Sequence, residues 1–185
     1  EVKQRVGELT KTAKMVYGNL DEVSVIGANS KDGAFLAPIL LREDDPFVNT
    51  EIHEIEAFGP VSTLMPYKTL TEAIHLAHLG KGSLVSSIVT NSDSIAKEYV
   101  VEAATHHGRI LVLNRENEKE STGHGSPLPT LVHGGPGRAG GGEEMGGMRG
   151  VKHYLQRCAI QGTPTTLTEI TGIYQPKGVY KATDK

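Results

Sequence analysis

The sequence predicts an α/β fold with a mainly parallel sheet, and three observations support this class. Short apolar runs typical of buried strands alternate with segments whose apolar residues recur every three or four positions, as in an amphipathic helix. The order strand–helix–strand–helix–strand extends over residues 61–114, and such units form parallel sheets with helices on their faces. The chain has 185 residues, which is enough for one domain with its own core.

The beginning of the chain predicts one helix followed by two short strands. Residues 23–26 predict a strand closed by Gly27, and residues 34–41 predict a second strand. Pro38 makes this second strand irregular or places it at a sheet edge. The helix precedes both strands and ends near Gly18, and its apolar face consists of Val2, Val6, Leu9, Ala13 and Val16.

The regular alternation begins with a strand over residues 61–65. Thr69 and Glu72 have the spacing of a capping box, which predicts the start of a helix. Gly80 follows the last apolar residue of this helix and predicts its end.

Two further strands and a second helix complete the alternation. Residues 84–90 predict a buried strand, and residues 91–93 supply a turn and a helix N-cap. The helix continues to Ala104 and closes at Gly108, and residues 110–113 form the third strand. Farther on, residues 151–159 predict a helix. Residues 163–170 are rich in threonine, a β-branched residue that favours strands, and predict an extended strand.

The carboxyl ends of the three predicted strands mark a candidate ligand site. Parallel sheets bind ligands beyond these ends, which fall at Tyr67, Thr90 and Asn114. Eleven of the 22 glycines lie between Gly123 and Gly150. Such a density indicates a loop that turns sharply and approaches something closely, and loops of this kind carry function. Because the segment follows the third strand, we expect it to lie across the carboxyl end.

Composition excludes several classes of function. The formal net charge of −3 gives no reason to expect nucleic acid or an anionic membrane as a partner, and no apolar run has the length of a transmembrane helix. The single cysteine, Cys158, excludes an internal disulfide and fits a reducing compartment, so we expect a cytoplasmic protein. The first residues look like the inside of a helix without an initiator Met, and we expect a piece of a longer protein.

Glu56 and Phe58 begin the motif Glu-Ala-Phe-Gly-Pro-Val at residues 56–61. A carboxylate can accept two hydrogen bonds from a ribose diol, and an aromatic ring can pack on a flat heterocycle. The alternative from spacing alone is a surface Glu and a core Phe.

This motif resembles the nucleotide-contacting motif of the aldehyde dehydrogenase superfamily. Residues 131–144, which contain His-Gly-Gly and end in Gly-Gly-Gly-Glu-Glu, resemble the glycine-rich segment of the same superfamily, and the order of the remaining segments agrees over nearly the whole chain. Residues 147–157 and 160–164 are similar to one branch, which acts on CoA-thioester semialdehydes in bacterial degradation of phenylacetate and other aromatic compounds.

The resemblance implies a three-layer αβα catalytic domain that oxidises an aldehyde to a carboxylic acid with NADP⁺ or NAD⁺, the branch favouring NADP⁺. A cysteine thiolate would attack the aldehyde, hydride would pass to the nicotinamide, and a glutamate-activated water would release the acid. Glu56 would hold the nicotinamide ribose and Phe58 would pack against the nicotinamide ring. Glu144 would match the glutamate of the glycine-rich motif and relay protons.

The nucleophilic cysteine and the base of the superfamily lie before the Glu56 motif, so the resemblance implies that this chain lacks both and is inactive alone. Cys158 lies in the segment predicted to be helical, and we interpret it as a small, partly buried apolar residue. An alternative function is a noncatalytic assembly or ligand-binding domain derived from the same fold.

The resemblance also implies an organisation in three parts and a homo-oligomer. Residues 1–160 would be the C-terminal part of the catalytic domain, residues 161–175 an oligomerisation strand that pairs with another subunit, and residues 176–185 a polar tail or linker. The substrate would be an aldehyde, with a CoA-linked one expected from the branch.

The remaining polar groups predict no metal site. The pairs His75–His78 and His106–His107 lack a cysteine or a carboxylate in a fixed pattern, and we interpret them as surface or helix-end histidines. Arg138 in the glycine-rich segment, or Arg149, could meet CoA phosphates, and the alternative is a loop that closes over the active-site side of the sheet.

Overall fold

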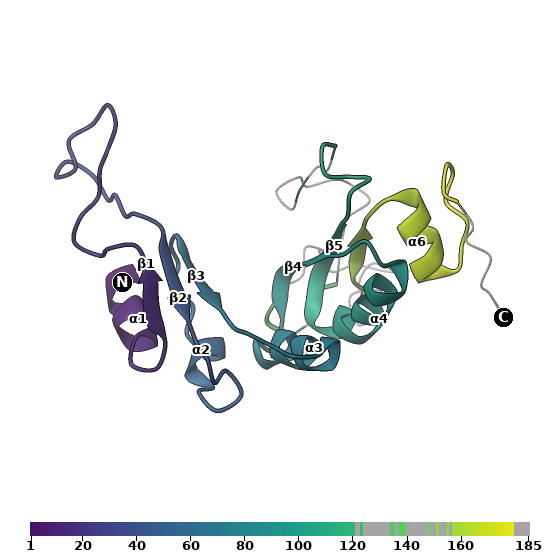
Figure 1. Cartoon of the computed structure of the whole chain (residues 1–185), viewed down its shortest axis with the longest axis horizontal. Helices are drawn as coiled ribbons and strands as arrows, with labels where there is room; N and C mark the ends of the chain where they lie inside the picture. Colours follow the sequence, from purple (N-terminus) through teal and green to yellow (C-terminus); the bar gives the residue numbers. More distant parts are fainter. Residues whose placement is uncertain are drawn as a thin grey trace. The chain divides into compact units, whose positions relative to one another are not determined.

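The computed structural model describes residues 1–120, 123, 134–135, 137–139, 148, 151, 155 and 157–179. The chain divides into two compact units, unit 1 (Glu1–Lys68) and unit 2 (Thr69–Lys185). Both units contain parallel strand pairs and helices, which confirms the predicted α/β class (Figure 1). No helix within the described ranges is long and apolar enough to cross a membrane.

Unit 1 is a three-stranded sheet of order β1-β2-β3 with two helices. β1 is antiparallel to β2, and β2 is parallel to β3, with Leu41 opposite Thr63. The core of this unit joins α1 to the sheet and to α2 and consists of Val6, Leu9, Ala13, Ile39, Leu41 and Ile52. The elements are α1 (Val2–Leu9), β1 (Lys14–Tyr17), β2 (Ile39–Arg42), α2 (Glu51–Glu54) and β3 (Val61–Leu64).

The first helix and the first two strands differ from the predictions. The helix ends at Leu9, and the residues expected to continue it turn into β1, where pairing with β2 overrides the helical spacing. The strand predicted at residues 23–26 is wrong, since Ile26 is fully exposed and no strand forms there. β2 starts only after Pro38, with the Ile39 N–H donating to the Pro60 carbonyl. Proline lacks the N–H that an earlier start would need.

Unit 2 is a parallel sheet of order β4-β5-β6, with Ile88 opposite Val112 and Ile110 opposite Ile160. Helices α3, α4 and α6 pack on one face of it (Figure 1). Its buried cluster consists of Ile74, Ala96, Tyr99, Val100, Ala103, Ile110 and Val112. The elements are α3 (Leu70–Leu79), β4 (Ser83–Val89), α4 (Asp93–Ala103), the 3₁₀ turn η1 (Ala104–His106), β5 (His107–Leu113), the 3₁₀ turn η2 (Gly137–Ala139), β6 (Ala159–Gln161) and α6 (Pro164–Thr171).

The helix starts of unit 2 follow the predicted caps. The Thr69 hydroxyl accepts a hydrogen bond from the Glu72 N–H at 3.1 Å, and the Ser92 hydroxyl accepts from the Ile95 N–H at 3.4 Å. Each cap satisfies one of the backbone donors that a helix N-terminus leaves open.

The strand predicted at residues 163–170 is wrong, because these residues form α6. Thr163 caps the helix by accepting from the Thr166 N–H, Pro164 occupies the first turn, and Gly172 ends it in the left-handed conformation. These are start and stop signals of a helix, and they override the strand preference of β-branched residues. Likewise, Cys158 lies just before β6 rather than in a helix.

Candidate functional site

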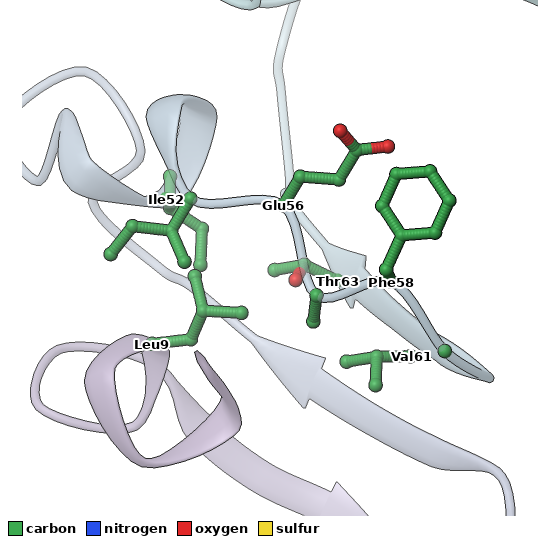
Figure 2. A pocket seen from close by; sticks show the side chains of 9 residues that line it. Leu9, Ile52, Glu56, Phe58, Val61 and Thr63 are labelled. Atoms are coloured by element: carbon green, nitrogen blue, oxygen red, sulfur yellow. The ribbon is translucent and has the colours of Figure 1, made fainter. Parts of the chain in front are cut away.

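Glu56 and Phe58 lie on the extended segment between α2 and β3, and the segment alternates between core and solvent. Ile55 and Ala57 pack against the core of unit 1, whereas Glu56 and Phe58 are exposed. Figure 2 shows both exposed side chains on the same side of the segment. Phe58 is therefore not a core residue, since 81% of its surface is exposed.

Two tight turns, one centred on Phe58 and one on Pro60, hold the loop in place. The Gly59 N–H donates to the Ala57 carbonyl at 2.7 Å, and the Val61 N–H donates to the Gly59 carbonyl at 2.8 Å. A Cβ at Gly59 would lie 2.7 Å from Cγ1 of Val2 in α1. The Gly-Pro pair thus allows the chain to turn into β3 while it touches the start of α1.

A pocket of about 430 Å³ lies beside this loop, and we call it the Glu56 pocket. Leu9 and Ile52 supply apolar walls from α1 and α2, while Glu56 and Phe58 extend away from them, as Figure 2 shows. The lining residues are Leu9, Ile52, Ile55, Glu56, Ala57, Phe58, Gly59, Val61 and Thr63. A hollow that combines two apolar walls with an exposed carboxylate and an exposed ring suits a flat heterocycle joined to a sugar.

Glu144, the third predicted site residue, lies outside the described residues, as do His133 and Arg149. Two described residues of the glycine-rich segment, Gly134 and Arg138, contact the amino ends of strands. The Gly134 N–H donates to the Arg157 carbonyl before β6, and the Arg138 N–H donates to the Lys81 carbonyl before β4, each at 2.9 Å. The expectation that the segment lies across the carboxyl ends is not met at these two contacts.

Gly137 explains how the segment can approach that edge. Its φ of +57° lies in the left-handed region, and a Cβ there would overlap the Lys81 carbonyl oxygen. Only glycine combines this conformation with this proximity.

Cys158 is partly buried and packs against the core of unit 2, as predicted. Burial raises the pKa of its thiol to about 11. A nucleophilic cysteine needs a lowered pKa, because the thiolate is the reactive form. Cys158 is therefore not suited to attack an aldehyde.

The histidines form a contact that the sequence did not predict. The rings of His78 and His106 stack with centroids 4.1 Å apart, and His107 is buried with 4% exposure at the start of β5. Its Nδ1 forms a 2.6 Å hydrogen bond with the Ser83 hydroxyl. Burial, with a smaller contribution from His78 and His106, lowers the pKa of His107 to about 4. The apolar run at residues 110–113, which begins three residues after His107, is the signal that could have extended the predicted strand back to it.

The part of the chain that the structure describes contains no group of three His, Cys, Asp or Glu side chains arranged to hold a metal ion.

The structure brings together two of the three predicted strand ends. Thr90 and Asn114 border a pocket of about 450 Å³ at the carboxyl ends of β4 and β5, and we call it the strand-end pocket. Tyr67, the third predicted end, belongs to unit 1. The lining residues are Val89, Thr90, Asn91, Leu113, Asn114, Arg115 and Glu118.

Comparison with known proteins identifies relatives. Residues 2–160 match the model of the aldehyde dehydrogenase family. The chain is 57% identical to "Protein MaoC" of Klebsiella aerogenes over 141 residues, which cover 76% of this chain and 42% of that protein. It is 34% identical to 3,4-dehydroadipyl-CoA semialdehyde dehydrogenase of Aromatoleum evansii over 131 residues, or 71% of this chain and 25% of that protein.

A more distant relative is "Aldehyde dehydrogenase, dimeric NADP-preferring" of Mus musculus, 26% identical over 151 residues, or 82% of this chain and 28% of that protein. The chain thus spans less than half the length of each of these relatives. The match over residues 2–160 includes the Glu56 motif and the whole of the glycine-rich segment.

Proposed function

The chain belongs to the aldehyde dehydrogenase family, and from this membership we propose that the protein oxidises an aldehyde to a carboxylic acid, with Glu56 and Phe58 holding the nicotinamide half of NAD⁺ or NADP⁺. Members of this family are NAD(P)-dependent oxidoreductases, and one relative is named as NADP-preferring. The main support for the proposal is that the Glu56 and Phe58 side chains lie on the same exposed side of one segment and both line the Glu56 pocket.

The residues present fit the cofactor. The exposed Glu56 carboxylate can accept hydrogen bonds from the two hydroxyls of a ribose. Most of the Phe58 ring is exposed, so a flat ring of a ligand can pack against it. When bound, the nicotinamide accepts the hydride that leaves the substrate. Glu56 and Phe58 would orient this ring, and orientation is a large part of what a protein contributes to such a transfer.

We propose that this chain by itself does not oxidise aldehydes. Its single thiol, Cys158, has a pKa raised by burial and lacks the environment that activates a nucleophile. In the same account Glu144 relays protons during release of the acid.

The substrate we propose is a CoA-linked semialdehyde from bacterial degradation of phenylacetate or a similar aromatic compound. The identity to an enzyme named for a CoA semialdehyde supports this substrate class. We also propose a cytoplasmic homo-oligomer, supported by the single cysteine and by the relative named as dimeric. The predicted strand at residues 163–170 has no part in it, because those residues are helical.

Cofactor binding tests the proposal directly. Isothermal titration calorimetry with NADP⁺ and NAD⁺ should give weaker binding for Glu56→Gln and for Phe58→Ala, by about fivefold each, because each substitution removes roughly 1 kcal/mol of contact. Matched controls are Glu22→Gln and Tyr17→Ala, an exposed carboxylate and an exposed aromatic residue of the same unit. Equal affinity in all five proteins would exclude the proposed contacts.

A noncatalytic binding or assembly domain derived from the same fold is the second candidate. NADPH formation distinguishes the two: turnover by the complete protein that contains this chain supports an enzyme, and cofactor binding without turnover supports the second candidate.

A further inference from the structure

Glu43 is a buried charged residue of unit 1 that the proposed cofactor contacts do not include. It directly follows β2, and only 3% of its surface is exposed. Its N–H donates to the Leu64 carbonyl at the end of β3, at 2.9 Å, so its backbone is fixed to the sheet. Burying a carboxylate is costly unless it is hydrogen-bonded, and the partners of Glu43 therefore indicate its role.

One oxygen of this carboxylate holds the loop at residues 44–50, which leads to α2. Glu43 Oε1 accepts from the Asp45 N–H and from Asn49 Nδ2, each at 2.9 Å. Burial acts to raise the pKa of Glu43, but these two hydrogen bonds, with a smaller contribution from Thr12, outweigh it, and the pKa is lowered. Both bonds are therefore charge-assisted and belong to the stronger class of hydrogen bonds.

Asn49 connects the Glu43 carboxylate to the first turn of α2. While its side chain donates to Glu43, its backbone carbonyl accepts from the Ile52 N–H at 3.4 Å. Within the described residues 49–54, the N-cap residue Thr50 makes no side-chain cap hydrogen bond. The bond from Asn49 to Glu43 thus fixes where the helix begins, which a cap would otherwise do.

The helix α2 needs such an anchor because it has only four residues. A single helical turn is not stable by itself. Ile52 packs in the core of unit 1, and His53 Nε2 forms a 2.7 Å hydrogen bond with the Pro46 carbonyl of the same loop. The position of α2 therefore depends on its core contact and on the loop that Glu43 holds.

The segment with Glu56 and Phe58 continues α2 without a linker, as Figure 2 shows between Ile52 and Glu56. Ile55 is the C-cap residue of α2 and is already extended, with φ of −89° and ψ of 114°. A shift or rotation of α2 would therefore move the Glu56 carboxylate and the Phe58 ring together.

We propose that Glu43 is a positioning residue of the cofactor site, which sets the start of α2 through Asn49 and so holds Glu56 and Phe58 in the arrangement that contacts the nicotinamide half. This inference rests on the function proposed above for those two residues. Glu43 does not line the Glu56 pocket and acts only through α2. Without this anchor, only a fraction of the molecules holds the competent arrangement, and the apparent dissociation constant rises by the inverse of that fraction.

Amide chemical shifts of the isotope-labelled 185-residue chain test the positioning without any cofactor. We expect Glu43→Leu and Asn49→Ala to move the signals of Glu56 and Phe58. Glu43→Gln should leave them in place, because its amide oxygen can still accept both hydrogen bonds. The control Val6→Ala truncates a buried residue of α1 and should lower the stability of unit 1 without moving these two signals.

Calorimetric titration with NADP⁺ tests the effect on the site. Glu43→Leu and Asn49→Ala should each weaken binding by about threefold, and Glu43→Gln should restore it. In the Glu56→Gln, Phe58→Ala background, Glu43→Leu should cause no further loss, because the residues through which it acts are absent. A merely structural role would weaken binding by the same factor in both backgrounds.

Three results would overturn the inference: unmoved Glu56 and Phe58 signals in both Glu43→Leu and Asn49→Ala, equal losses in the two backgrounds, or a loss in Glu43→Gln as large as in Glu43→Leu. Asn49→Ala decides the matter if Glu43→Leu does not fold, which urea denaturation shows. If even the unchanged protein does not bind NADP⁺, the proposed function fails, and the amide shifts still decide whether Glu43 positions the segment.

Discussion

Glu56 and Phe58 point to the same side of one extended segment, while Ala57 between them packs into the core of unit 1. The alternation follows from extended backbone, in which residues two apart share a face. This alternation places the Glu56 carboxylate and the Phe58 ring together on the exposed side. The packing of Ala57 against the core holds the segment in place.

Removing the outward side chains should leave the fold intact. Because Glu56 and Phe58 are exposed, we expect the double variant Glu56→Gln, Phe58→Ala to change the free energy of unfolding by no more than about 0.5 kcal/mol. Urea denaturation measures this change. Ile52→Ala, which truncates a buried side chain of the same pocket, is the contrast and should cost about 2 kcal/mol or more. Similar losses in both would mean that the outward residues are structural.

Gly59→Ala should destabilise unit 1 through its contact with α1. The added Cβ would lie 2.7 Å from Val2 Cγ1, and we expect a loss of about 1 kcal/mol. Val2→Ala removes the obstructing methyl groups, so Gly59→Ala should cost measurably less in that background. A double-mutant cycle from urea denaturation checks the coupling, and full additivity would contradict the contact.

His107 should make the stability of the protein depend on pH. Its pKa falls from 6.5 to about 4 on folding, so between these values the unfolded chain binds a proton that the folded chain does not. Stability is therefore complete above pH 6.5 and decreases as the pH falls toward 4, by up to about 3 kcal/mol.

His107→Gln should flatten the unfolding free energy over this window, whereas substitution of the exposed His75 by Gln should not. If the unfolding free energy of His107→Gln fell as steeply with pH, the pH dependence would come from other titratable groups.

Thr166→Val should cost about 1–3 kcal/mol, because it leaves Asp93 Oδ1 and Asn114 Nδ2 without the hydroxyl that they share. Thr171→Val on the same helix removes the hydrogen bonds of an exposed hydroxyl to Leu167 and Ile173 and should cost less, because water can replace them. Thermal unfolding of both variants provides the comparison. An equal effect would show that the buried hydrogen bonds of Thr166 do not stabilise the protein.

Local signals predicted unit 2 best. The caps at Thr69 and Ser92 act within one helical turn, and β5 contains the apolar run at residues 110–113, so neighbours in sequence determine them. β4 forms at the predicted place, but the prediction that it is buried is wrong, because Leu84 and Val89 are exposed.

The α6 helix was missed because its four threonines favour strands, whereas Pro164 and Gly172 and the burial of Thr166 decide the outcome. Tertiary packing commonly overrides such preferences.

The candidate site was predicted in part. The motif at residues 56–61 indicated the residue types, but not that Val2 of α1 would lie against Gly59, which depends on packing between distant segments. The hydrogen bond between Glu43 and Asn49 also could not be inferred, because it forms only when the loop at residues 44–50 folds back on the end of β2. The predicted role of Glu144 stays a prediction.

The central claim is that Phe58 contacts the nicotinamide ring beside Glu56. The most direct measurement is the nuclear Overhauser effect between the nicotinamide protons of NADP⁺ and the ring protons of phenylalanine, since the chain contains only three Phe residues. The account predicts contacts to Phe58 that disappear in Phe58→Ala. Contacts to Phe35 or Phe47 instead, or none to any Phe in a protein that binds NADP⁺, would contradict it.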